Sequence, residues 1–149
     1  MTHYSTKQYG HDIGISACFR QWRATHSHCR YSHGYALAFK FTFTASELDD
    51  RNWVQDYGSL KPLKAELERL FDHKTIVAED DPLLNSFIEM EKKGAMQLTI
   101  LPAVGCEKFA EFAFDLADKF LHDQGCAPRV KVVSCEVKEH GANSAIFTR

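Results

Sequence analysis

The chain has 149 residues and a formal net charge of −2, a length typical of one domain with a buried core, here residues 1–149. So weak a charge gives no electrostatic basis for binding nucleic acid or an anionic membrane, and no apolar run approaches the ~20 residues of a spanning helix. Residues 1–10 lack the apolar core of a signal peptide, so we expect a cytoplasmic protein. The five cysteines are odd in number and form no CxxC pair, so we expect no disulfide framework.

The first third of the chain predicts two strands. Residues 11–22 alternate in polarity, and residues 34–45 are rich in aromatic and β-favouring types, so we expect a strand in each range. The polar, histidine-rich residues 23–32 between them predict a loop. Residues 46–52 should turn in solvent, and residues 53–57 predict a short extended piece.

The rest of the chain predicts helices and then a closing hairpin. Leucines 60, 63, 67 and 70 recur at helical spacing, and residues 106–122 carry a broad apolar stripe. Residues 87–92 predict a further helix, and residues 97–101 a short strand. Residues 130–137 and 144–148 predict the last two strands. The order β-β-α-(α)-α-β-β indicates an α+β fold, in which helices cover one face of a four-stranded antiparallel sheet. Such a sheet leaves free edges, which oligomerisation would cover.

Two positions could carry acid–base or thiol chemistry. Cys29 lies among His28, Arg30 and His33, which could lower its pKa or act as a base beside it. Asp72 precedes His73 just past a helix, where a carboxylate could orient an imidazole as general base. The plainer alternatives are a small buried thiol and a surface imidazole.

Two carboxylates and a histidine-rich loop are further candidates. Glu139 ends an apolar strand, where it could make paired hydrogen bonds to the amidine-like edge of a bound ring. Glu107 falls in the first turn of a helix, where the helix dipole alone would favour an acid. His26, His28, Cys29 and His33 supply four possible zinc ligands within eight residues. An exposed polar loop is the alternative reading of that cluster.

Six motifs in register resemble the 6-pyruvoyl-tetrahydropterin synthase / 6-carboxy-tetrahydropterin synthase family. They run through nearly the whole chain: Cys29-x3-His33-Gly34, the long strand that follows it, Val54-x-Asp56-Tyr57-Gly58-x-Leu60-Lys61, Phe71-Asp72-His73-Lys74, Cys106-Glu107, and Val137-Lys138-Glu139. The resemblance implies the tunnelling fold (T-fold), in which sheets of several subunits join into a barrel. It also implies active sites at subunit interfaces of a trimer-based or hexameric homo-oligomer.

The resemblance implies a role for each matching residue. Cys29 matches the cysteine that moves a proton on the substrate side chain, and Asp72 and His73 match its acid–base partner. Glu139 matches the carboxylate that anchors the pterin ring, and Cys106 and Glu107 match a second substrate-binding position. The chain is thus similar to a lyase that converts 7,8-dihydroneopterin triphosphate. The short gap before His33 resembles the 6-carboxy-tetrahydropterin branch, which feeds deazaguanine (queuosine) synthesis.

The zinc positions of the family are altered in this chain. The family uses a histidine in the first strand and both histidines of a His-Gly-His motif. Here His33 is retained and Tyr35 stands at the second position, while a gapless count back from Cys29 places the first on Cys18. His26 or His28 could substitute as ligands. Alternatively the metal is lost and an arginine, at position 20, 23 or 30, supplies the positive charge.

Three hypotheses therefore follow from the sequence. The first is an enzyme of the tetrahydropterin synthase type, with zinc that would polarise side-chain oxygens of the substrate. The second is an enzyme of different chemistry on the same scaffold, without the usual zinc. The third is a non-catalytic protein that binds a pterin or purine.

Overall fold

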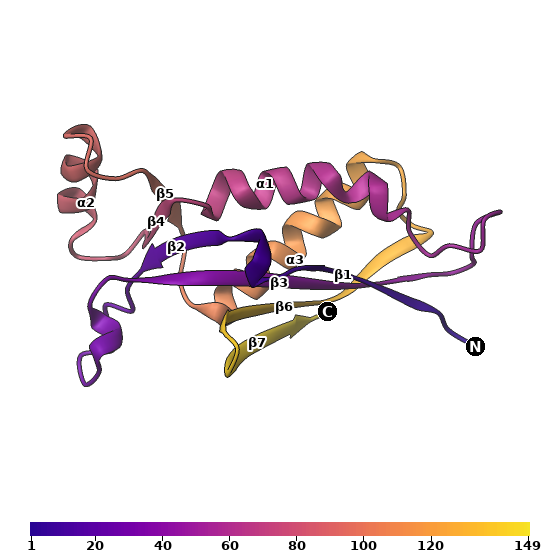
Figure 1. Cartoon of the computed structure of the whole chain (residues 1–149), viewed down its shortest axis with the longest axis horizontal. Helices are drawn as coiled ribbons and strands as arrows, with labels where there is room; N and C mark the ends of the chain where they lie inside the picture. Colours follow the sequence, from indigo (N-terminus) through magenta and orange to yellow (C-terminus); the bar gives the residue numbers. More distant parts are fainter.

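The computed structural model describes all residues from 1 to 149, and its centre is one curled sheet with helices against it (Figure 1). The strands are β1 (Tyr4–Tyr9), β2 (Ile15–Phe19), β3 (His33–Ala45), β4 (Lys74–Ala78), β5 (Leu98–Leu101), β6 (Val130–His140) and β7 (Asn143–Thr148). The helices are α1 (Lys61–Phe71), α2 (Leu84–Lys92) and α3 (Cys106–Asp123). None of these helices is both long enough and apolar enough to cross a membrane.

The sheet differs from the predicted four-stranded antiparallel one. It has seven strands in the order β5-β4-β2-β3-β6-β7, with β1 paired to β3, and the pairs β2–β4 and β4–β5 are parallel. The sequence pattern missed β1 because its residues 5–8 are all polar, and pairing with β3 holds it in place. It missed β4 because no glycine or proline separates that strand from α1. Both strands extend the sheet that the α+β prediction described.

Strand β3 carries most of the sheet's pairing. Its first five residues pair with β2, and its remaining length pairs with β1 on one edge and with β6 on the other. Only residues 15–19 of the predicted strand at 11–22 are in β2, because Gly10 and Gly14 bracket a 3-10 turn that separates β2 from β1. Gly14 has φ of 77° and so favours glycine.

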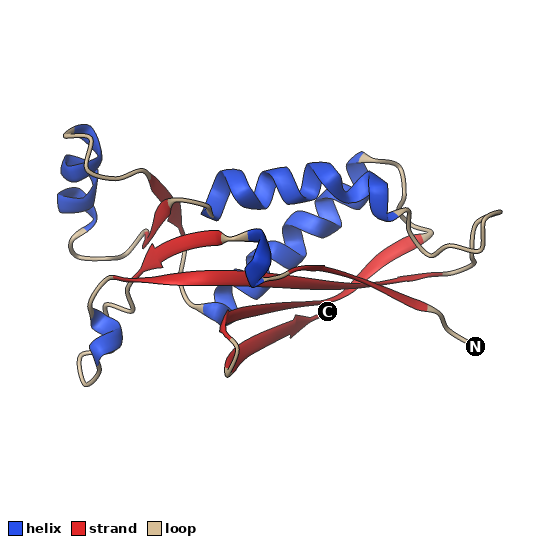
Figure 2. Ribbon diagram, in the orientation of Figure 1, coloured by secondary structure: helices blue, strands red, loops and turns tan.

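Helices α1 and α3 lie on the same side of the sheet, whereas α2 lies beyond β4 and β5 (Figure 2). Their apolar faces meet the sheet through a chain of aromatic rings. Phe71 of α1 packs on Phe39 of β3 at 5.2 Å between ring centroids, and on Phe109 of α3 at 5.3 Å. Phe109 in turn meets Phe19 of β2 at 5.0 Å. The core thus extends without interruption to the end of β2.

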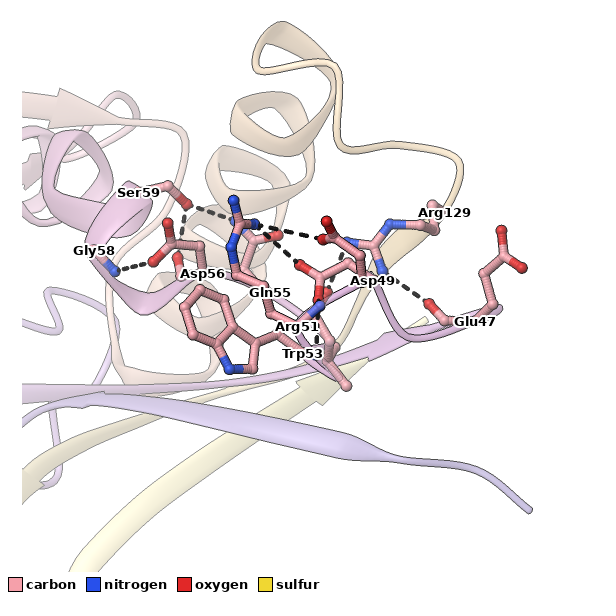
Figure 3. A network of polar contacts seen from close by, with 11 residues as sticks. Glu47, Asp49, Arg51, Trp53, Gln55, Asp56, Gly58, Ser59 and Arg129 are labelled. Carbon is pink, nitrogen blue, oxygen red and sulfur yellow. Dashed lines mark hydrogen bonds and ion pairs between the residues drawn. The ribbon is translucent and has the colours of Figure 1, made fainter.

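The segment between β3 and α1 is a fixed loop and not the extended piece expected for residues 53–57. The Arg129 guanidinium donates hydrogen bonds to the carbonyls of Glu47 and Val54, at 2.8 and 3.0 Å (Figure 3). The Asp49 carboxylate accepts hydrogen bonds from the backbone amides of Arg51 and Trp53. These polar contacts take the place of the backbone hydrogen bonds that a paired strand would make, so the loop is held without strand pairing.

Candidate active site

Cys29 lies on a loop that side chains hold at the end of β2. Its amide donates a hydrogen bond to the Ser27 hydroxyl at 3.1 Å, which caps a 3-10 turn, and its carbonyl accepts one from the Gln21 amide at 2.8 Å. The Arg20 guanidinium also reaches this loop, at 3.3 Å from the Arg30 carbonyl. The thiol is exposed, so it is free to meet a ligand.

Glu139 comes from the far end of the chain but borders the same space as Cys29. Two adjoining cavities, of about 540 and 620 Å³, both include Cys29, Tyr35 and Glu139 in their walls. These volumes fall in the range of small-molecule sites. The Asn143 amide donates to the Glu139 carboxylate at 3.0 Å and so orients it across the β6–β7 turn. The structure therefore brings together the predicted thiol and the predicted ring anchor.

The start of α3 forms another wall of the smaller cavity, where both Cys106 and Glu107 lie. Burial, with added repulsion from the carboxylates of Glu139 and Glu107, raises the pKa of the Cys106 thiol to about 12. Cys106 is therefore a neutral contact and no nucleophile at physiological pH. Glu107 is exposed and lies at the helix N-terminus, where the dipole favours its charge.

Gly105 allows this wall to approach β2 closely. Its φ is 113°, and a β-carbon there would lie 2.3 Å from Nε2 of Gln21. That amide nitrogen donates to the Val104 carbonyl at 2.9 Å, which ties the start of α3 to the end of β2. Gln21 and Phe19 line the cavity and were not among the predicted site residues. The alternation Ile15, Ala17, Phe19 along β2 was the signal that could have found Phe19.

Asp72 and His73 form a pair but lie in the wall of neither cavity. The imidazole Nδ1 is 2.9 Å from the Asp72 carboxylate, and His73 is 81 % exposed. The pair is also hydrogen-bonded to β2: the Ser16 amide donates to the Asp72 carboxylate, and the His73 amide donates to the Ser16 carbonyl. His73 has φ of 58°, a strained conformation for a residue other than glycine, which is often found at functional sites.

The Asp72 carboxylate stays ionised beside this imidazole. Its partial burial would raise its pKa, but hydrogen bonds from the Ser16 amide and from His73 outweigh burial and hold the pKa below its usual value. An ionised Asp72 keeps the proton of His73 on Nδ1, so Nε2 is the nitrogen that faces solvent for acid–base exchange. Such an arrangement is chemically able to exchange protons, but the pair lies outside the walls of the two cavities that Cys29 lines.

The expected zinc ligands do not converge. In the β2–β3 ladder, Phe19 is opposite His33, Ala17 is opposite Tyr35, and Cys18 is opposite Gly34. Because successive side chains of a strand point to opposite faces, Cys18 points away from His33 and Tyr35. Burial raises the pKa of Cys18, opposed by a hydrogen bond with Thr75 on that other face.

The remaining alternatives for the metal do not assemble either. His28 is exposed in the turn that holds Cys29 and lines neither cavity. No three histidine, cysteine, aspartate or glutamate side chains of the chain lie where they could hold one ion together. Zinc sites in proteins need at least three such ligands. The donor set of this chain therefore does not fit the zinc that the family implies.

The three arginines expected as alternatives to the metal have other partners. Arg20 is bound by Asp81 and Arg23 by Asp80. The Arg30 guanidinium donates to the Thr25 carbonyl and to the Tyr31 hydroxyl. None of the three arginines lines either cavity.

Comparison with known proteins places this chain in a family. The family model of 6-pyruvoyl tetrahydropterin synthase matches residues 11–149. The chain belongs to the 6-pyruvoyl tetrahydropterin synthase family. It is 30 % identical over 124 residues to the 6-carboxy-5,6,7,8-tetrahydropterin synthase of Aquifex aeolicus, a match that covers 80 % of this chain and 75 % of that relative.

Solved structures agree with this assignment at the level of the fold. An uncharacterized protein of Wolinella succinogenes superposes with a TM-score of 0.80 at 19 % identity, over 99 % of this chain and 98 % of that one. The 6-pyruvoyl tetrahydropterin synthase of Plasmodium falciparum gives 0.71 at 13 % identity, over 99 % and 98 % of the two chains. The 6-pyruvoyl tetrahydropterin synthase of Caenorhabditis elegans gives a TM-score of 0.64 at 14 % identity, over 100 % of this chain and 95 % of that one. The α+β T-fold prediction is thereby confirmed, with the strand count and pairing corrected above.

Proposed function

We propose that this chain is a lyase of the 6-carboxy-5,6,7,8-tetrahydropterin synthase type, which acts on 7,8-dihydroneopterin triphosphate or a close relative of it. The observation that carries the proposal is the shared cavity wall of Cys29 and Glu139, 110 positions apart in the sequence. The family membership and the relative in Aquifex aeolicus support the substrate class. We also propose that the protein is cytoplasmic and that it takes part in deazaguanine (queuosine) synthesis.

Glu139 is the group we assign to the pterin ring. A carboxylate accepts two parallel hydrogen bonds from the N–H and amino groups of such a ring, and paired bonds of this kind fix orientation. Asn143 holds one oxygen of Glu139 and so limits its rotation. Cys106 and Glu107 border the ring position on the α3 side. The ring is thereby set with its side chain toward Cys29.

Cys29 is the group we assign to proton removal. In a 7,8-dihydropterin the C=N bond of the ring acidifies the hydrogen on the adjacent side-chain carbon. The Cys29 thiolate takes that proton, the C–H electron pair forms a C=C bond to the ring, and the displaced C=N pair gains a proton at nitrogen. The acid that supplies this second proton is the His73 imidazolium. The step shifts one proton and needs no oxidant or reductant.

His73 must reach this site from a second copy of the chain, because it does not line the cavities of its own. Strands β5 and β7 are at the ends of the sheet, and β1 pairs along one edge only. These free edges are suited to pairing between copies. The proposal therefore includes a homo-oligomer, based on trimers or a hexamer, in which each site combines Cys29 of one copy with Asp72 and His73 of another.

Incubation with 7,8-dihydroneopterin triphosphate, followed by mass spectrometry of the product, tests the activity. Cys29→Ala should lower the turnover at least ~100-fold, the usual contribution of a positioned acid or base. Cys126→Ala is the matched control, because this half-buried thiol lines neither cavity. No turnover by the wild-type chain would reject the enzyme and favour a pterin-binding protein. Full activity in Cys29→Ala would reject the assignment of proton removal to Cys29.

Mixing two inactive variants tests the shared site. Cys29→Ala and His73→Asn should each be inactive alone, and asparagine tolerates the left-handed backbone at position 73. After unfolding and refolding together in equal amounts, about a quarter of the sites would combine an intact Cys29 and an intact His73. A mixture as inactive as its components would show that the site does not cross between copies.

A further inference from the structure

The face of the sheet that carries His33 and Tyr35 has an aromatic ring where a third ligand would be. Phe19 is directly opposite His33 in the β2–β3 ladder, and its ring stacks on Tyr35 at 4.6 Å between centroids. Phe109 of α3 makes an edge-to-face contact with Phe19 at 5.0 Å between ring centroids, and Phe19 is only 3 % exposed. Phe19 is therefore fixed in place and cannot give way to an ion.

The imidazole of His33 has no free lone pair. Its Nδ1 lies 2.8 Å from the Tyr31 carbonyl, which can only accept, so Nδ1 carries the hydrogen. In the neutral ring Nε2 is then the acceptor, and it is bonded to the Tyr35 hydroxyl. The Tyr35 hydroxyl must be the donor in that bond. A metal ion could bind His33 only after this bond is broken.

The same bond decides what Tyr35 offers to a ligand. Its single hydrogen is used on His33, and the chain provides no second partner for its oxygen. The side chain lines both cavities, together with Cys29 and Glu139. The lone pairs of the Tyr35 oxygen can therefore accept a hydrogen bond from a ligand but cannot stabilise a carbonyl or an oxyanion.

We propose that this pocket works without a metal ion, and that the Tyr35 oxygen, oriented by His33, binds a hydroxyl group of the substrate side chain by accepting its hydrogen bond. Tyr35 would bind the hydrogen of the substrate hydroxyl, whereas a metal ion binds the lone pairs of substrate oxygens. Tyr35 thus selects a hydroxylated side chain over one that lacks a donor. This selection rests on the proposed pterin function, whereas the metal-free character of the pocket does not.

Titration of the untagged wild-type chain with Zn²⁺ alone, by calorimetry, tests the first part. The histidine-rich loop can bind zinc weakly, so the comparison with His33→Ala is decisive. We expect identical isotherms for the two proteins. One equivalent of tightly bound zinc in the wild type, lost in His33→Ala, would overturn the proposal.

A gain-of-function variant makes the zinc test sharper. Phe19→His/Tyr35→His would place three imidazoles on one face of the sheet, and it should gain one equivalent of zinc and a higher melting temperature with zinc present. Phe19→Leu/Tyr35→Phe, which offers no new ligand, is its control. Should the double histidine variant fail to fold, the wild-type and His33→Ala titrations decide alone.

Binding of two matched pterins tests the second part. 7,8-Dihydroneopterin carries side-chain hydroxyls, and 6-methyl-7,8-dihydropterin does not. The wild type should prefer the first by about five- to tenfold, as one neutral hydrogen bond provides, and Tyr35→Phe should lose the preference while it keeps its packing on Phe19. If Tyr35→Phe still preferred 7,8-dihydroneopterin as strongly as the wild type does, the assignment of Tyr35 would be overturned. Failure of the wild type to bind either pterin would overturn it together with the proposed function, and the zinc titrations would still decide on the metal.

Discussion

The ion pair of Arg20 and Asp81 fixes the loop that carries Cys29, and Asp81→Asn is the change that would expose its contribution. The guanidinium donates to both carboxylate oxygens, at 2.8 and 2.6 Å, and the Leu83 amide donates to one of them. The side chain of Asp81 is 2 % exposed and that of Arg20 is 18 % exposed. Loss of the negative charge would leave a largely buried guanidinium without its partner.

The expected loss follows from this burial. Removing one partner of a fully buried pair costs about 3–5 kcal/mol. Since Arg20 retains some contact with solvent, we expect the lower end, about 3 kcal/mol, or a fall in melting temperature of roughly 6–12 °C for a chain of this size. Urea unfolding followed by circular dichroism measures the free energy directly. Activity should fall as well, because Arg20 also bonds to the Arg30 carbonyl beside Cys29.

The neighbouring pair provides a matched control. Asp80 bonds to Arg23 at 3.0 Å, but these side chains are 53 % and 73 % exposed. Solvent screens such a pair, so Asp80→Asn should leave the stability close to that of the wild type. Equal losses in Asp80→Asn and Asp81→Asn would refute the argument from burial.

The pH dependence of stability gives a second readout of the same pair. Burial would raise the pKa of Asp81, but the hydrogen bonds from Arg20 and the Leu83 amide outweigh it, so the pKa lies below its usual value. The ionised Asp81 therefore contributes its full stabilisation above the pKa of an unfolded aspartate, about 4. This stabilisation is lost as the pH falls through the lower pKa that Asp81 has in the folded chain. The wild type should lose stability over that acid range, and Asp81→Asn should lose less there. Parallel acid profiles would contradict this assignment.

Two further predictions concern the cavity wall and the thiols. Gly105→Ala should destabilise the fold by about 1–3 kcal/mol, because its φ of 113° and the close approach of Gln21 leave no room for a β-carbon. Gly141→Ala, which meets nothing within 4 Å, should have no such effect in the same urea titration. Iodoacetamide at neutral pH should modify the exposed Cys29 before the buried Cys135. Peptide mass spectrometry over time measures the order, and early labelling of Cys135 would contradict the packing.

The sequence was sufficient for the elements whose own pattern decides their structure. The leucine spacing predicted residues 60–70 as a helix, and α1 spans Lys61–Phe71. The stripe at residues 106–122 matches α3, Cys106–Asp123. Strand β1 could not be predicted in this way, because its polar residues depend on hydrogen bonds to β3 that local polarity does not report.

The sequence named several residues that line the cavities, but it could not predict how the candidate residues are arranged. Cys29 and Glu139 were named from motifs, and the shared cavity supports placing them in one site. A count along the chain put the first-strand position on Cys18, whereas the ladder puts Phe19 opposite His33. Such a count cannot decide which side chains of β2 lie on the same face of the sheet as His33, because a shift of one residue exchanges the two faces of a strand.

The uneven pairing of β3 has a consequence for local stability. From Ala38 onward β3 has β6 as a partner, whereas residues 33–37, which include His33 and Tyr35, are paired only with β2. Hydrogen exchange of backbone amides should therefore be faster in residues 33–37 than in residues 39–44, which lie between two strands. Tyr35 lines both cavities, so we expect a ligand bound there to slow exchange first in residues 33–37.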